Sequence, residues 1–160
     1  MFAAEQQAIR LEAKHNALLE AKNNYWASEV ETQRIATAAW IANAKGQPDE
    51  ALRLMRAAAA LKDRNEKHIA TPGRVVPARE LLGEILLEHK QPAAALKEFE
   101  QAQQREPNRL SGYAGAAAAA DATGERHKAR QHYAKLVELT READTSLPEV
   151  GRAKTYLAAK

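Results

Sequence analysis

The sequence contains no cysteine, which excludes disulfides, thiolate metal sites and cysteine nucleophiles but does not choose between cytoplasm and periplasm. Only 5% of the 160 residues are aromatic, and alanine supplies much of the 45% that are hydrophobic. A core rich in alanine buries little apolar area per residue, so we expect the backbones to pack closely. No window approaches about eighteen consecutive apolar residues, so no segment is predicted to span a membrane.

A strong excess of charge of one sign is also missing. The 24 basic and 21 acidic residues give a net charge of +3, spread along the chain. Such a balance predicts neither a nucleic-acid nor a membrane partner. The start, from Met1 to Gln7, has no basic segment followed by an apolar run, so no signal peptide is predicted in this chain. Both cytoplasmic and periplasmic locations remain open.

Catalytic and metal-binding motifs are equally lacking. The sequence has no HExxH, GxSxG, phosphate-binding loop or dinucleotide fingerprint. The two closest histidines, His127 and His132, stand five residues apart and so face different sides of a helix. We therefore predict no cofactor, no metal and no enzymatic activity. An enzyme remains a third alternative that would need residues to cluster in space.

The sequence does contain helical spacing throughout, whereas valine, isoleucine and threonine are too sparse for strands. A first face combines small and larger residues at alternating steps of four and three: Ala4, Ala8, Leu11, His15, Leu18 and Lys22. Glycine and proline lie between such segments, as at Gly46 to Pro48 and at Gly124. The pattern predicts an all-α fold with helices of roughly 12–20 residues. A capping box from Ser146 to Glu149 predicts the start of a last helix.

An internal repeat organises these helices. Ala95, Phe99 and Ala102 align with Ala129, Tyr133 and Leu136 at an offset of 34 residues. A third copy lies upstream at an offset of 44, around Ala39, Ala51 and Met55, so we expect an insertion at 66–75. In each hairpin a small residue on the first helix meets one on the second, and a larger residue fills the gap to the next hairpin. One hairpin cannot bury its own face, so several must stack.

The run from Leu82-Gly83 through Ala95, Phe99 and Ala102 to Pro107 resembles a tetratricopeptide (TPR) repeat, and the chain is similar to TPR regions of longer bacterial proteins. The resemblance implies a right-handed α-solenoid. Its parts are an N-terminal helix and the start of a long helix (1–31), a degenerate repeat (32–65), the insertion (66–75), two repeats (76–109 and 110–143) and a capping helix (144–160). Arg79 departs from the family, which usually has a large apolar residue there.

In this family the first helices of the hairpins line a concave groove that holds peptides. Carried over by position, the groove residues are Gln33, Trp40, Asn43, Glu80, Glu84, Glu88, Ser111 and Asp121. The three glutamates form a stripe on one helix at steps of four residues. Like charges at this spacing destabilise a helix by roughly 0.2–0.5 kcal/mol per pair. The stripe is either kept for a basic ligand or is a solvated face. Carboxylates at these positions argue against an acidic chaperone tail as partner.

Aromatic and basic residues each have two interpretations. Trp40 is either a groove anchor or a core residue, and we expect Tyr25 and Trp26 to pack between the N-terminal helix and the first hairpin. The basic cluster from Arg126 to Arg130 has no glycine-rich loop or aromatic platform beside it. It is therefore predicted to be a solvated face rather than a nucleic-acid site.

The sequence supports two functional hypotheses. The first is a non-catalytic protein–protein interaction module that holds a peptide or helix with basic residues in the groove. The second is a structural spacer or self-association domain of a larger TPR protein. In the second case the interfaces would lie at the two ends, formed by Phe2, Ile9 and Leu11 and by Val150, Tyr156 and Leu157.

Overall fold

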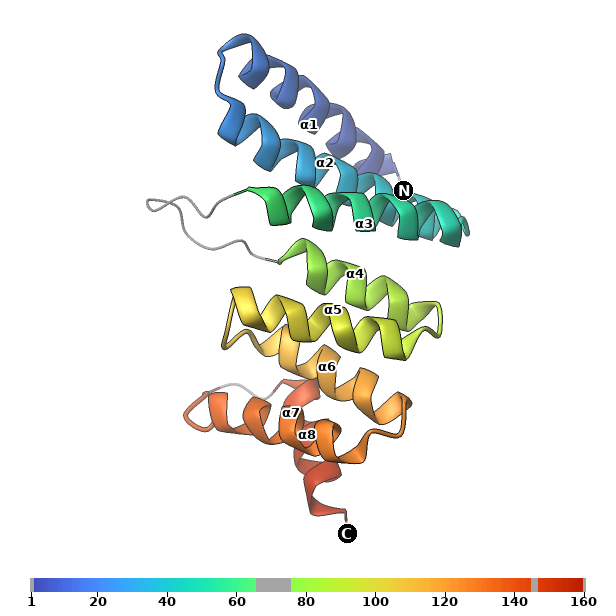
Figure 1. Ribbon diagram of the computed structural model, residues 1–160, viewed down its shortest axis with the longest axis vertical. Helices are drawn as coiled ribbons and strands as arrows, with labels where there is room; N and C mark the ends of the chain where they lie inside the picture. The colour runs from blue at the N-terminus through green and yellow to red at the C-terminus, as the bar shows by residue number, and fades with distance from the viewer. Residues whose placement is uncertain (1, 66–75, 145–146, 160) are drawn as a thin grey trace. The chain divides into compact units, whose positions relative to one another are not determined.

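The computed structural model describes residues 2–65, 76–144 and 147–159 (Figure 1). These residues form eight helices and no strand, which confirms the all-α class. The predicted insertion at 66–75 and Ser146 of the predicted capping box lie outside the described residues. The helices are α1 (Phe2–Glu20), α2 (Asn24–Ala44), α3 (Pro48–Arg64), α4 (Ala78–Glu88), α5 (Pro92–Arg105), α6 (Leu110–Ala122), α7 (Arg126–Leu139) and α8 (Pro148–Ala158).

The chain divides into two compact units, Met1–Ile85 (unit 1) and Leu86–Lys160 (unit 2). In unit 1, α2 packs against α1 on one side and against α3 on the other (Figure 1). In unit 2, α6 packs against both α5 and α7, and α7 packs against α8. Within the described residues, short turns join α1 to α2 and α2 to α3 in unit 1, and α5 to α6 and α6 to α7 in unit 2.

The turns that close three hairpins have the same geometry. Gly46, Lys90 and Gly124 all have a positive φ, of 71°, 56° and 78° respectively. After each of them, one backbone N–H reaches back to the carbonyl five residues earlier, as Gln47 N does to Ala42 O at 3.0 Å. This is the Schellman arrangement that ends a helix with a left-handed residue. These turns recur at the offsets of 44 and 34 residues that the sequence pattern showed.

Lys22 ends α1 in the same way. Its φ is 54°, and the following Asn23 N–H donates to Leu18 O at 2.9 Å. The expectation that the helical spacing of the first helix continues to Lys22 is therefore wrong. Of that face, Leu11 is buried and Ala8, His15 and Leu18 are half-buried, while Ala4 is exposed. Helix α1 ends at Glu20, so Lys22 belongs to the turn that follows the helix.

Buried alanines lie on the paired helices at the positions that the repeat pattern predicts. Between α2 and α3, Ala39 and Ala51 are fully buried, and Met55 beside them is fully buried as well. Between α6 and α7, Ala117 and Ala129 are likewise buried, with Tyr133 in the position that corresponds to Met55. Small side chains let two backbones approach, which offsets the small apolar area that each alanine buries.

Polar contacts bind α3 to its neighbours in unit 1. Arg79 of α4 forms an ion pair with Asp63 of α3, with Nε 3.3 Å from Oδ1 and Nη2 in contact with Oδ2. A TPR repeat usually has a large apolar residue at the position of Arg79. Here the arginine forms an ion pair instead. Lys62 donates from Nζ to Oε1 of the buried Glu29 at 2.8 Å, which joins α3 to the beginning of α2.

The last helix packs against the end of unit 2. Val150 and Ala153 of α8 are buried in a cluster with Tyr133 and Leu136, and Tyr156 and Leu157 pack against it. The Tyr156 ring lies 4.7 Å from the ring of Tyr133. Leu147 is the N-cap residue of α8, and its side chain makes no capping hydrogen bond. Val150, Tyr156 and Leu157, offered as an interface in the second hypothesis, are therefore part of the packing within the chain.

Candidate functional site

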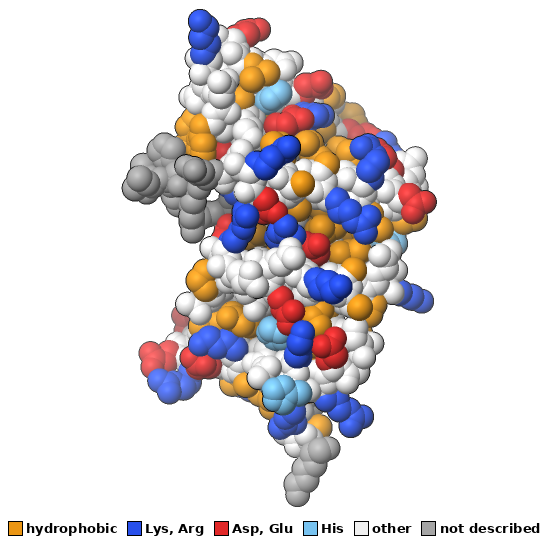
Figure 2. All heavy atoms as spheres, viewed as in Figure 1, with side chains coloured by type: hydrophobic (Ala, Val, Ile, Leu, Met, Phe, Trp, Pro, Cys, Tyr) orange, Lys and Arg blue, Asp and Glu red, His pale blue; other side chains and the backbone are white. Residues whose placement is uncertain are grey.

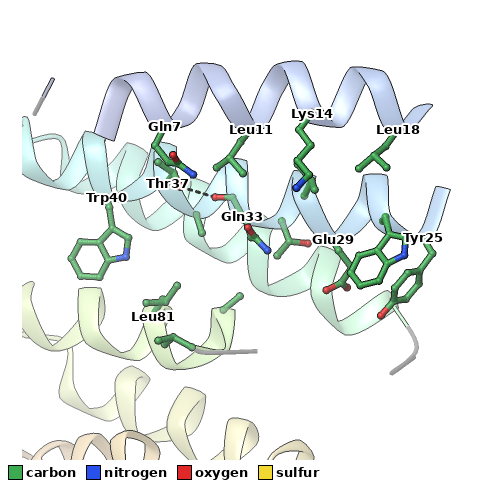
Figure 3. A pocket seen from close by; sticks show the side chains of 16 residues that line it. Gln7, Leu11, Lys14, Leu18, Tyr25, Glu29, Gln33, Thr37, Trp40 and Leu81 are labelled. Carbon is green, nitrogen blue, oxygen red and sulfur yellow. Dashed lines mark hydrogen bonds between the residues drawn. The ribbon is translucent and has the colours of Figure 1, made fainter. Parts of the chain in front are cut away.

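Unit 1 contains a groove with a volume of about 870 Å³, which we call the unit 1 groove (Figure 3). It is lined by α1, by α2, by Val76 just before α4, and by Ala78 and Leu81 at the beginning of α4. A space of this size falls in the range of about 300–1,000 Å³ that is typical of ligand sites. Trp40 and Leu81 point into it from opposite walls (Figure 3).

The α1 wall is a single helical stripe formed by Gln7, Leu11, Lys14 and Leu18. Their spacing of four, three and four residues keeps all four side chains on one side of the helix. Leu11 is only 7% exposed, so its side chain forms the floor of the groove. Lys14 and Gln7 are exposed and bring polar groups to the edge.

The α2 wall carries the aromatic side chains of the groove. Trp40 is half-buried at one end, and Tyr25 lies at the other (Figure 3). The ring of Trp26, which also lines the groove, stands beside that of Tyr25. Gln33 lies between Trp40 and Tyr25, so two of the groove residues implied by the TPR resemblance, Gln33 and Trp40, line this space. The remaining α2 residues of the wall are Glu29, Val30, Thr32, Ala36 and Thr37.

Trp26 was missed as a site residue by the sequence analysis. Its side chain is 42% exposed and lines the groove together with Lys14 and Leu18 of α1, so it is not fully enclosed between the N-terminal helix and the first hairpin. Its ring stands edge-on to that of Tyr25, with the centroids 5.2 Å apart and the planes at 80°. Two adjacent aromatics at the start of an otherwise alanine-rich helix were the available signal, since aromatic residues are scarce in this chain.

Glu29 brings a carboxylate to the groove, but its charge is balanced locally. The side chain is 7% exposed and accepts hydrogen bonds from Lys62 Nζ at 2.8 Å and from Asn65 Nδ2 at 3.2 Å. A buried carboxylate needs such partners because its transfer out of water is costly. Through these hydrogen bonds, Glu29 connects α2 to the end of α3.

The acidic stripe of α4 does not have uniform surroundings. Glu80 is 1% exposed, Glu84 is half-buried and Glu88 is exposed. The interpretation as a solvated face is thus wrong for Glu80. None of the three glutamates lines the unit 1 groove, and Asn43 does not line it either.

The other residues implied by the resemblance lie in unit 2. Ser111 and Asp121 are exposed on α6. Desolvation raises the pKa of the Tyr156 phenol, and the carboxylate of Asp121 nearby raises it further. Asp121 is thus engaged with a residue of α8. Of the eight predicted residues, the structure brings Gln33 and Trp40 together in the unit 1 groove, and the binding role of all eight stays a prediction.

The remaining charged clusters serve contacts between helices. Arg130 donates to the carbonyls of Leu157 and Ala159 at 3.2 Å each, at the end of α8. Lys128 lies 3.1 Å from Glu100 and 3.5 Å from Glu125. Among the described residues, no three histidine, aspartate or glutamate side chains converge as a metal site would require. Within the same residues, no helix is both long and apolar enough to cross a membrane.

Comparison with known proteins identifies the fold. No protein-family model matches the sequence, and no curated protein matches it. A solved structure, titled "MamA RS-1 ArsTM double mutant", superposes with a TM-score of 0.57 at 15% sequence identity, covering 94% of this chain and 92% of that chain. MamA is a TPR-like protein, so the likeness shows a TPR-like fold and confirms the predicted α-solenoid class.

Proposed function

We propose that this protein is a non-catalytic interaction module that holds a segment of a partner protein in the unit 1 groove. The observation that carries the proposal is the groove itself, about 870 Å³ in volume and bordered by two tryptophans, Trp26 and Trp40. Tryptophan is enriched among residues that dominate binding energy, because a rigid indole buries a large area in a pocket.

One ion pair joins the two helices that form most of the groove's walls. Glu5 Oε1 lies 2.8 Å from Lys45 Nζ, which connects the beginning of α1 to the residue that follows α2, and His15 Nδ1 lies 3.9 Å from Glu31 Oε2 between the same two helices. Arg34 holds the pKa of Glu31 below its usual value by hydrogen bonding to the carboxylate. A preorganised surface loses less conformational entropy on binding, so affinity comes from few anchors.

The TPR resemblance extends this proposal beyond the groove. It implies further partner contacts at Asn43, Ser111 and Asp121 and at the glutamates of α4. Glu84 and Glu88 retain solvent-accessible surface and are the members of the stripe suited to basic side chains of a partner. Chaperone tails of acidic character would meet repulsion at these two residues.

The test is capture of partners from a lysate of the source organism, identified by mass spectrometry. The bait would be the parent chain beside Trp40→Ala and a matched control, Leu19→Ala, whose side chain is 47% exposed on α1 and does not line the groove. Loss of a central aromatic anchor costs about 2 kcal/mol, or roughly thirtyfold in affinity. We expect Trp40→Ala to lose the partner and Leu19→Ala to keep it.

Circular dichroism would confirm that both variants are folded. A partner captured equally by Trp40→Ala and by the parent would exclude the unit 1 groove as the binding site. A Glu84→Lys, Glu88→Lys variant tests the stripe separately: loss of capture by this variant alone would place the contact on α4.

The second candidate function, self-association, is favoured by two exposed apolar side chains on α1. Phe2 is 75% exposed and Ile9 is 59% exposed, and both lie on the side of α1 opposite Leu11. Leu11, which the hypothesis included, is buried and lines the groove instead. Self-association predicts a dimer by light scattering that Phe2→Ser with Ile9→Ser converts to monomer. A parent chain that is already monomeric would exclude it.

A further inference from the structure

We propose that the segment held in the unit 1 groove is extended rather than helical, with an apolar side chain near each end and a carboxylate between them. This inference rests on the proposed function and adds the chemistry of the partner. Three features of the groove support it: its length, the amide side chains on its walls and the charge of Lys14.

The two tryptophans set the length of the occupant. Trp26 and Trp40 lie fourteen residues apart on α2, which corresponds to about 21 Å along the helix axis at 1.5 Å per residue. An extended chain advances about 3.3 Å per residue, so about six residue steps connect the two indoles. An apolar side chain at each end of such a segment would meet one indole.

Amide side chains on both walls suit an extended backbone. Gln7 on α1 and Gln33 on α2 line the groove and are exposed. Neither side-chain amide has a hydrogen-bond partner within the part of the chain that the structure describes. Each amide offers donors and an acceptor, which complement the N–H and C=O groups that an extended peptide leaves unpaired. The backbone N–H and C=O groups of a helix are already hydrogen-bonded within the helix, so a helical segment would offer the two amides no backbone partner.

The charge inside the groove favours a carboxylate. Among the described residues that line it, Lys14 and Glu29 carry formal charges, and Glu29 is already paired with Lys62. Lys14 forms no ion pair among the described residues. Figure 3 shows its side chain reaching from α1 toward α2, between Trp40 and Tyr25, the neighbour of Trp26 in the sequence. An acidic side chain in the middle of the segment would therefore complete an ion pair that the chain alone lacks.

The test uses three fluorescein-labelled peptides with blocked ends. The first has seven residues, with leucine first and last, aspartate at the centre and serine elsewhere. The second has lysine at the centre. The third is an alanine-based helical peptide with its two leucines fourteen residues apart and aspartate between them. Fluorescence anisotropy measures binding to the full chain, and emission of the two tryptophans, both in the groove, reports occupancy.

We expect the aspartate peptide to bind more tightly than the lysine peptide by about fivefold, the upper range for a solvent-accessible ion pair. Lys14→Glu should reverse this order, whereas Lys154→Glu, a charge reversal at an exposed residue of α8, should leave it unchanged. Tighter binding of the helical peptide, or equal binding of the two extended ones, would overturn the proposal.

The outcome also separates this inference from the proposed function. If no peptide binds while Trp40→Ala still abolishes capture of a protein from lysate, the groove is the binding site and the extended acidic segment is wrong. If Trp40→Ala leaves capture unchanged, the groove function fails, and the inference fails with it.

Discussion

At Gly115, in α6, the backbone lies so close to the Phe99 ring that an added Cβ would be 2.3 Å from Cζ. Real carbon atoms do not approach so closely, and two further ring carbons lie within 2.8 Å. Gly115 is therefore required by packing against Phe99, which is 1% exposed and has no room to withdraw. At Gly151, in α8, an added Cβ would meet no atom within 4 Å.

We expect Gly115→Ala to lower the free energy of unfolding by about 1–3 kcal/mol, because overpacking outweighs the better helix propensity of alanine. Urea denaturation followed by circular dichroism measures the change. Gly151→Ala is the matched control and should raise the free energy of unfolding by about 0.5–1 kcal/mol. Stabilisation by both substitutions would show that Phe99 can move aside.

His132 makes stability depend on pH. Desolvation lowers the pKa of this imidazole from its usual 6.5, and the Glu100 carboxylate, 3.5 Å away, opposes part of the shift. A pKa lower in the folded than in the unfolded chain means that the unfolded chain binds the proton more readily. Its contribution to stability is therefore present above pH 6.5 and is lost as the pH falls through the lowered pKa.

We expect an NMR titration to give His132 a pKa below 6.5. Between neutral pH and about pH 5, His132→Gln should lose less stability than the parent chain, because glutamine does not titrate. A pKa of His132 above its usual value would mean that the attraction of Glu100 exceeds the cost of burial.

At the scale of elements, the turns at Gly46, Lys90 and Gly124 share one geometry but not one residue type. Gly46 and Gly124 take the left-handed position, and Lys90 takes it between α4 and α5. A side chain makes this conformation costly, by about 1–2 kcal/mol, whereas glycine adopts it freely. The repeated hydrogen bonds hold Lys90 there, as in the donation from Gln91 N to Leu86 O at 2.8 Å.

Lys90→Gly should therefore raise the free energy of unfolding by about 1 kcal/mol. Thermal or urea unfolding measures the gain. Gly124→Ala introduces the opposite change at the corresponding turn and should destabilise the chain by a similar amount. If Lys90→Gly has no effect, the lysine side chain must contribute a compensating contact.

Helix α2 shows how one element serves both packing and the groove. It contacts α1 and α3, and its remaining side lines the groove. Apolar and small residues consequently surround the helix on nearly every side, from Ala27 and Val30 to Ala39 and Trp40. A helix with partners on several sides shows no single apolar face, so periodicity does not reveal which residues face the groove.

At the scale of the whole molecule, the chain forms two compact units, and basic and acidic side chains intermingle over the face drawn in Figure 2. In repeat proteins each hairpin contacts mainly its neighbours, so stability is approximately a sum of local contributions. A destabilised repeat can then open without unfolding the rest.

We expect hydrogen exchange of Gly115→Ala, followed by mass spectrometry, to be faster in α5, α6 and α7 than in the parent. The amides of α1 and α2 should keep most of their protection, because these helices belong to unit 1. An equal loss of protection along the whole chain would show that the two units unfold as one cooperative system.

The sequence by itself determined the helical class, the offsets of the turns and the small residues between paired helices. These features are local, or repeat at a fixed spacing, so composition and periodicity are sufficient to reveal them. Ala39 with Ala51 and Ala117 with Ala129 follow from this reasoning. The left-handed turn at Lys90 also lies at the predicted offset, although a lysine does not by itself indicate a left-handed backbone conformation.

Only the tertiary structure decided which side chains remain available to a partner. Glu80 and Leu11 became buried, whereas Trp26 and Lys14 line the groove at exposed positions. The reason is physical: exposure depends on which helix lies opposite a residue, and that neighbour belongs to a distant part of the sequence. Periodicity places a side chain on a face of its own helix, and packing between helices decides whether that face meets another helix or an open groove.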